Sequence, residues 1–204
     1  MDYFLGIDLG SSSVKVSILD GKKGKSIISC NYPEKEMNIF SFKSGWAEQD
    51  PDYWWKCILS CFKILNKKID FSLIASIGIS YQMHGLVLID INGKPLRKSI
   101  IWCDSRAVDI GKKANETIES KIISMNLLNS PGNFTASKLK WVMDNESDLY
   151  KSIYKIMLPG DYISYKLTNK INTTQSGLSE CILWDFKNKN ISNDLTSYFG
   201  FKKD

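Results

Sequence analysis

The 204-residue sequence has two arginines, one histidine and no long apolar run. No stretch approaches the ~18 consecutive apolar residues that a membrane-spanning helix needs. Met1–Asp8 contains two acidic residues, whereas a secretion signal opens with basic residues and an apolar segment. These absences predict a cytoplasmic protein with no membrane partner.

The positive charge is carried by lysine. The net charge is +5, and Arg97 and Arg106 are the only arginines among the 27 basic residues. The lysines are scattered along the chain, whereas a nucleic-acid-binding surface needs clustered basic residues with aromatic residues between them. We therefore expect no nucleic-acid partner.

The five cysteines form no C-x-x-C pair, and their odd number does not suggest a disulfide framework. Cys57 and Cys61 lie four residues apart, on one face of an expected helix. A metal site would need further ligands nearby, and the single histidine, His84, is distant in sequence. We expect these thiols to be reduced and buried as small apolar groups.

Hydrophobic residues make up 43% of the chain and charged residues 24%, which is typical of a globular domain. Alternating patterns predict strands at 3–8, 14–20, 26–32, 73–81, 85–91 and 99–102, and helical spacing predicts helices at 51–67, 107–125, 135–144 and 161–167. Small-residue turns join the first strands into antiparallel hairpins. This order predicts an α/β fold with a mixed sheet, antiparallel hairpins and packed helices. No linker or repeat divides residues 1–204.

The first hairpin contains the first candidate site. Asp8 ends a strand, and Gly10, Ser11, Ser12 and Ser13 follow it in a tight turn. Backbone N–H groups and hydroxyls in such a turn suit a phosphate chain, and a neighbouring carboxylate suits Mg²⁺. The alternative is a polar hairpin turn in which Asp8 only accepts local hydrogen bonds.

Gln82, Met83 and His84 form the second candidate, because they follow one strand and precede another. Ligand sites of mixed sheets form at strand ends. A single histidine is, however, more often a hydrogen-bonded structural residue. Trp102 ends the strand predicted at 99–102 and is either part of the core or part of a site. Asp104 or Ser105 is expected to cap the next helix.

Taken together, several motifs resemble the N-terminal domain of the FGGY family of sugar kinases, in the same order and with similar spacing. They are Asp8-Leu9-Gly10-Ser11, Gly45 to Pro51, Gln82-Met83-His84-Gly85, Trp102 to Arg106, Lys138 to Trp141, Leu158 to Tyr162 and Thr173 to Asp185. The resemblance covers essentially the whole chain.

The resemblance implies the ribonuclease H-like fold of actin and hexokinase, with ATP and Mg²⁺ as cofactors. Asp8 would be a catalytic residue that holds Mg²⁺ through water, and the turn Gly10–Ser13 would border the ATP phosphates. Gln82, Met83, His84 and Trp102 would line the sugar. Asn133 and Phe134 would lie in the loop that closes the same pocket.

Within the family, Gln82–Gly85 resembles the xylulose kinases, whereas glycerol kinases carry an Arg-Glu pair in place of Met83 and His84. The implied reaction is transfer of the γ-phosphoryl group of ATP to the terminal hydroxyl of D-xylulose. A sister kinase for glycerol, ribulose or gluconate is the nearest alternative. A non-catalytic actin-like binding module is another, although it has no use for the motif Gln82–Gly85.

Full-length family members are more than twice as long as this chain. The resemblance places the aspartate that acts as base, and the adenosine-binding domain, beyond Asp204. Residues 1–204 would then be an incomplete N-terminal domain that is inactive alone. Apolar segments at 182–186 and 198–201 would be exposed and would favour self-association, which leaves a homodimer open.

Overall fold

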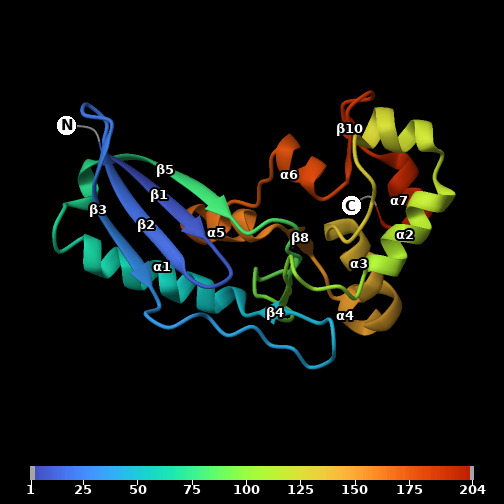
Figure 1. The fold of residues 1–204 in the computed structure, drawn as a ribbon, viewed down its shortest axis with the longest axis horizontal. Helices are drawn as coiled ribbons and strands as arrows, with labels where there is room; N and C mark the ends of the chain where they lie inside the picture. Colours follow the sequence, from blue (N-terminus) through green and yellow to red (C-terminus); the bar gives the residue numbers. More distant parts are fainter. Residues whose placement is uncertain (1–2, 203–204) are drawn as a thin grey trace.

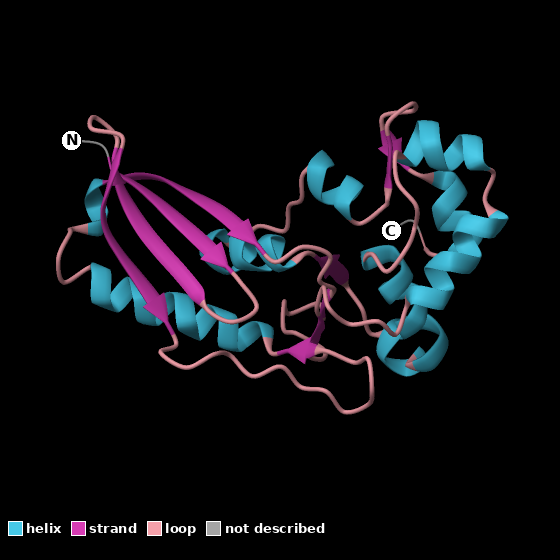
Figure 2. Cartoon of the chain, in the orientation of Figure 1, coloured by secondary structure: helices cyan, strands magenta, loops and turns pink. Residues whose placement is uncertain are grey.

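The computed structural model describes residues 3–202 and has a sheet at one end and a helix-rich part at the other (Figures 1 and 2). Residues 1–2, part of the segment in which no secretion signal was predicted, lie outside the described residues, as do residues 203–204. No helix within residues 3–202 is long and apolar enough to cross a membrane.

The main sheet has the strand order β3-β2-β1-β5. Its strands are β1 (Tyr3–Leu9), β2 (Val14–Asp20), β3 (Lys25–Tyr32) and β5 (Ile74–Tyr81). The first three strands are antiparallel and β5 is parallel to β1, so the predicted mixed sheet and its hairpins are confirmed. A parallel pair needs a crossover connection, which α1 (Pro51–Leu65) supplies.

Helix α1 begins where the sequence predicts, because the Asp50 carboxylate accepts a hydrogen bond from the Asp52 N–H at 2.9 Å and proline occupies the first turn. Its apolar face packs on β2 and β3 beneath the sheet (Figure 1). The buried residues of this helix are Pro51, Trp54, Cys57, Ile58, Cys61 and Leu65. Both helix cysteines are therefore buried, as predicted, and all five cysteines of the chain are free thiols.

Side chains of β1 alternate between the two faces of the sheet. Leu5, Ile7 and Leu9 are buried against the helices, whereas Asp8 points to the opposite face and is exposed. On that outer face Gly6 lies in register with Gly78, and a Cβ at either glycine would meet nothing within 4 Å. The prediction that Asp8 ends a buried strand is wrong, because β1 continues to Leu9 and only one of its faces is buried.

The remaining strands form two-stranded ladders. They are β4 (Glu48–Gln49) with β7 (Ser99–Ile100), β6 (Val87–Ile89) with β8 (Lys155–Met157), and β9 (Trp184–Asp185) with β10 (Asn190–Ile191). The strand predicted at 85–91 is shorter than expected because Asp90 turns the chain. Its carboxylate accepts hydrogen bonds from the N–H groups of Asn92 and Lys94 at 2.9 and 2.8 Å.

The other helices are α2 (Val108–Thr117), α3 (Thr135–Asn145), α4 (Ser147–Lys151), α5 (Pro159–Thr168), α6 (Gln175–Glu180) and α7 (Asn193–Phe199), with a 3-10 turn η1 (Phe71–Leu73) and a π-helical turn η2 (Ile122–Leu127). The single helix predicted at 107–125 is wrong. The β-branched residue Ile118 adopts an extended backbone (φ −75°, ψ 135°), which ends α2 before η2 begins.

A second core lies in the helix-rich part. Ile182, Leu183 and Phe199 are 2%, 7% and 2% exposed and belong to this core. Most of the apolar surface expected at 182–186 and 198–201 is therefore buried within the chain. Phe186 remains 39% exposed, and self-association stays a prediction.

Candidate functional site

The tight turn after β1 is closed by its own backbone. The Gly10 N–H donates to the Ser13 carbonyl at 3.0 Å, and the Met37 N–H donates to the Ser12 carbonyl at 2.7 Å. Ser12 is exposed, and Ser11 and Ser13 are half-buried. The turn joins two strands and does not lead into a helix. An anion here would therefore meet serine hydroxyls and turn N–H groups, and not a helix N-terminus.

Asp8 lies just before this turn, directly opposite Lys15 of β2 and beside Ser80 of β5. Within residues 3–202, no three His, Cys, Asp or Glu side chains gather into a metal site. Mg²⁺ is commonly held by one or two carboxylates together with phosphate oxygens and water. A single exposed carboxylate next to a Gly/Ser turn fits that mode of binding, and it does not fit a cage made by protein ligands alone.

Gln82 connects the end of β5 to the turn. Its N–H donates to the Leu9 carbonyl at 2.7 Å, and its side-chain amide donates to Gln49 Oε1 at 3.0 Å. The Gln49 amide in turn donates to the Ser11 carbonyl at 2.6 Å. Gln82 is 8% exposed, and its Oε1 atom is buried without a partner in the described part of the chain. Gln82 is thus a buried residue that connects the end of β5, through Gln49, to the turn after β1.

His84 has a backbone φ of +57°, in the left-handed region that costs energy for residues other than glycine. Its N–H donates to Glu180 Oε1 at 2.6 Å, and its ring packs edge-on against Phe134 with 4.2 Å between centroids. The next residue, Gly85, packs closely on α5, because a Cβ there would lie 2.5 Å from Cγ of Pro159. These contacts hold the loop in its strained conformation.

Burial and, to a smaller extent, the Lys138 ammonium lower the pKa of His84 to about 4, against the opposing effect of its hydrogen bond to Glu180. The imidazole is therefore neutral near pH 7. Its Nδ1 atom lies 3.8 Å from Glu180 Oε1, too far for a hydrogen bond, and is buried without a partner among residues 3–202. A neutral ring can give or accept one directed hydrogen bond.

Trp102 is 50% exposed and therefore does not belong to the core. Its indole Nε1 lies 3.5 Å from the Ser11 hydroxyl oxygen. Met83, beside His84, is 55% exposed. The structure thus gathers the turn after β1, the Met83–His84 loop and Trp102 at one end of the sheet, and two of these side chains offer exposed apolar surface.

Asp104 does not cap α2, so the predicted capping by Asp104 or Ser105 is wrong. The helix begins after Ala107 without a side-chain cap. Asp104 is instead fully buried, accepts the Ala47 N–H at 2.6 Å and pairs with Arg106 at 2.7 Å. The Arg106 guanidinium lies 3.8 Å from the centre of the Trp46 ring. This network anchors the loop that carries Trp102.

Reasoning from residue types missed three residues that organise the cluster: Gln49, Lys138 and Glu180. Lys138 is fully buried in α3, where a lysine on the apolar face of a predicted helix was the available signal. Glu180 binds the Tyr81 hydroxyl at 3.1 Å as well as the His84 N–H. Nothing in the local sequence around Gln49 or Glu180 indicates a partner so distant along the chain.

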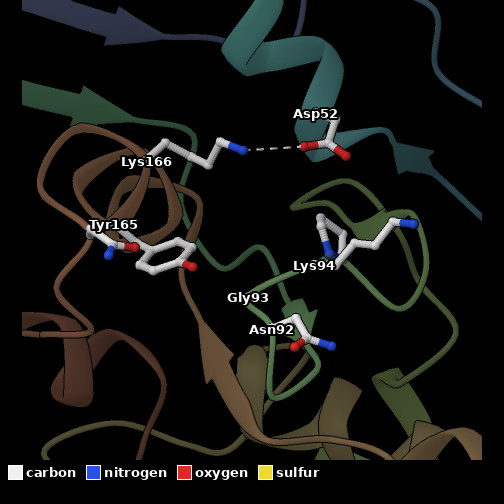
Figure 3. Close-up of a pocket in the computed structure, with 8 residues that line it drawn as sticks. Asp52, Asn92, Gly93, Lys94, Tyr165 and Lys166 are labelled. Atoms are coloured by element: carbon white, nitrogen blue, oxygen red, sulfur yellow. Dashed lines mark ion pairs between the residues drawn. The ribbon is translucent and has the colours of Figure 1, made fainter.

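Two hollows lie elsewhere. One, of about 440 Å³, is lined by Asp52, Asn92, Gly93, Lys94, Pro95, Tyr165, Lys166 and Asn169 (Figure 3). Its charges are partly satisfied, because Lys166 pairs with Asp52 at 3.7 Å. The other, of about 600 Å³, is largely apolar and includes Leu139, Ile156 and Phe201. None of the predicted site residues lines either hollow.

The chain is similar in sequence to curated sugar kinases. It is 36% identical to the xylulose kinase of Staphylococcus xylosus over 200 residues, which cover 96% of this chain and 40% of that protein. The chain spans about 40% of the length of the first curated relatives that it matches.

Solved structures agree with the predicted fold. A ligand-bound xylulose kinase from Lactobacillus acidophilus superposes with a TM-score of 0.87 at 25% identity, over 100% of this chain and 41% of that one. A gluconate kinase from the same organism gives the same TM-score and identity, over 99% and 40% of the two chains. These sugar kinases confirm the actin- and hexokinase-like fold class.

Motifs along the whole chain, from Asp8 to Asp185, predict the family. Residues 3–204 match the FGGY family of carbohydrate kinases, N-terminal domain. The match covers more than half of the chain by a wide margin, so the chain belongs to the FGGY family of carbohydrate kinases.

Proposed function

We propose that this chain forms the sugar-binding, phosphate-facing part of a kinase that transfers the γ-phosphoryl group of ATP to the terminal hydroxyl of D-xylulose. The observation that carries the proposal is the 3.5 Å approach of Trp102 Nε1 to the Ser11 hydroxyl, across 91 residues of sequence. Phosphoryl transfer depends mainly on holding donor and acceptor in one place. The turn proposed for phosphate and the indole proposed for sugar are neighbours.

The charges of the cluster suit an uncharged sugar. Met83 is apolar and the His84 imidazole is neutral near pH 7. The two nearby cations are occupied by protein groups: Lys138 donates to two backbone carbonyls, and Arg106 pairs with Glu48 and Asp104. Neither of these two cations is free to bind a gluconate carboxylate; the exposed Lys15 lies opposite Asp8, on the phosphate side. The identity to named xylulose kinases supports the same choice.

Asp8 and the turn would serve the phosphate side. Mg²⁺, when bound, would neutralise developing charge on the transferred group. The Asp8 carboxylate would hold it through water, with Gly10, Ser11, Ser12 and Ser13 bordering the phosphates. The adenosine pocket and the catalytic base would come from a continuation that corresponds to the rest of the relatives' length.

The proposal is tested by measuring sugar binding to the purified 204-residue chain. Isothermal titration calorimetry compares D-xylulose, D-ribulose, glycerol and D-gluconate. We expect D-xylulose to bind most tightly, and the Met125→Ala variant, altered in exposed η2, to behave identically. Tighter binding of gluconate or glycerol would reassign the substrate. Binding of none of the four would favour a non-catalytic actin-like module.

Phosphoryl transfer is tested with the longer kinase that we propose contains this chain, by following ADP release with Mg·ATP and each sugar. D-Xylulose should give the highest kcat/KM. The 204-residue chain alone should release no sugar-dependent ADP. Release from the short chain above an Asp8→Ala control would show that residues 1–204 hold a complete site.

A further inference from the structure

Lys138 is the most deeply buried cation near the candidate site. It lies in α3, its exposed fraction is 0%, and its ammonium donates to the His84 carbonyl at 2.7 Å and to the Ile101 carbonyl at 3.1 Å. These acceptors lie 54 and 37 residues away in sequence. One belongs to His84 itself, and the other belongs to the residue directly before Trp102.

Burying this ammonium is costly, because a charge leaves water for a low-dielectric interior. Burial accordingly lowers the pKa of Lys138 to about 8, and the negative charge of Asp104 opposes the shift. An apolar side chain of similar length would fill the same space without that cost. What the ammonium provides, and an apolar side chain does not, is a pair of hydrogen bonds to the His84 and Ile101 carbonyls.

Lys138 adds a side-chain link between the two loops to the backbone hydrogen bond that the Leu86 N–H donates to the Ile100 carbonyl at 2.9 Å. The Met83–His84 loop leaves the end of β5, and the Trp102 loop follows β7. An ammonium has three donors and can bind two carbonyls at a fixed separation. Lys138 binds the carbonyl of His84 itself and that of the residue before Trp102, so it joins the loops closer to these side chains than the Leu86–Ile100 bond does.

We propose that Lys138 is a positioning residue that sets the spacing between the Met83–His84 loop and Trp102, and thereby the affinity and selectivity for the sugar. This rests on the proposed function. Lys138 acts through the backbone and does not touch the sugar. Its loss would leave both side chains present, with the loops joined only through the Leu86–Ile100 bond and the spacing beyond it less defined.

The test compares Lys138→Met with the unmodified 204-residue chain, because methionine keeps the length of the stem and removes the donors. We expect the dissociation constant for D-xylulose to rise at least tenfold and the difference between D-xylulose and D-ribulose to shrink. Lys138→Gln, which keeps a neutral donor, should lose less. If Lys138→Met is unfolded at the assay temperature, Lys138→Gln takes its place.

A double-mutant cycle separates positioning from general destabilisation. If Lys138 acts through Trp102, the effects of Lys138→Met and Trp102→Ala on sugar binding should be strongly non-additive. The same cycle with Met125→Ala should be additive. A folded Lys138 variant with unchanged affinity and selectivity, or an additive cycle with Trp102→Ala, would overturn the inference. An unmodified chain that binds no sugar would instead overturn the proposed function.

Discussion

The indole Nε1 of Trp102 lies 3.5 Å from the hydroxyl oxygen of Ser11, although 91 residues separate them in sequence. The contact joins the turn after β1 to the loop after β7. The Gln82–Gln49–Ser11 hydrogen-bond chain makes a second connection to the same turn. Two independent links therefore hold the proposed phosphate turn next to the proposed sugar-binding residues, and the predictions below test each part.

Replacing Asp8 should impair catalysis without affecting folding, because its side chain is exposed on the open face of the sheet. In the longer kinase, we expect Asp8→Asn to lower kcat by on the order of 10³-fold, as for removal of a principal charge-stabilising group. The control is Glu116→Gln, which alters an exposed carboxylate in α2. Steady-state kinetics with Mg·ATP measures the effect. Turnover close to normal in Asp8→Asn would contradict the role.

Met83 should contribute to sugar binding and little to stability. Its side chain is 55% exposed in the structure, so truncation creates no cavity. We expect Met83→Ala to weaken D-xylulose binding by roughly 1 kcal/mol, about fivefold, through lost apolar contact. Met125→Ala, at 56% exposure in η2, is the matched control. Equal dissociation constants for Met83→Ala and the unmodified chain would remove Met83 from the site.

His84 should make stability depend on pH. Its folded pKa of about 4 lies below the ordinary value of 6.5, so the unfolded chain binds more protons between these pH values. The free energy of unfolding should therefore fall as pH decreases from 6.5 towards 4, by up to roughly 3 kcal/mol from this group. His84→Asn removes the titration and suits the positive φ.

Because His84 is the only histidine, comparison with His84→Asn isolates this contribution. Urea denaturation at pH 7, 6 and 5 measures it. We expect the free energy of unfolding of the unmodified protein, relative to that of His84→Asn, to decrease as the pH falls from 7 to 5. Parallel pH profiles would show that the ring is not held neutral by burial.

Gly85 should tolerate no side chain. A Cβ at this position would lie 2.5 Å from Cγ and 3.0 Å from Cδ of Pro159, so Gly85→Ala must displace the start of α5. Overpacking of this kind costs about 1–3 kcal/mol. Gly78→Ala is the control, because its Cβ would meet nothing within 4 Å. Urea denaturation should show a loss of stability for Gly85→Ala and little change for Gly78→Ala.

Local chemistry in the sequence determined the elements of the sheet. Alternating apolar residues predicted the first hairpin, and Asp50 with Pro51 predicted the start of α1, because strand alternation and helix capping depend on near neighbours. The same reasoning fails at 107–125. The apolar residues keep helical spacing through Ile118, but the backbone at Ile118 is extended and ends the helix. The family also followed from motifs in order along the chain.

Tertiary structure alone decided how these motifs act together. The sequence alone does not decide whether Trp102 belongs to the core or to the site, and it wrongly predicts a helix cap at Asp104. It assigns no role to Lys138, Gln49 or Glu180. Each depends on partners tens of residues away: Asp104 on Ala47, Lys138 on His84. Contacts of that range are set by how the sheet and helices pack, and no local pattern encodes them. The sequence therefore predicted residues for a sugar and a phosphate, and the packing of distant segments brings two of them, Ser11 and Trp102, together.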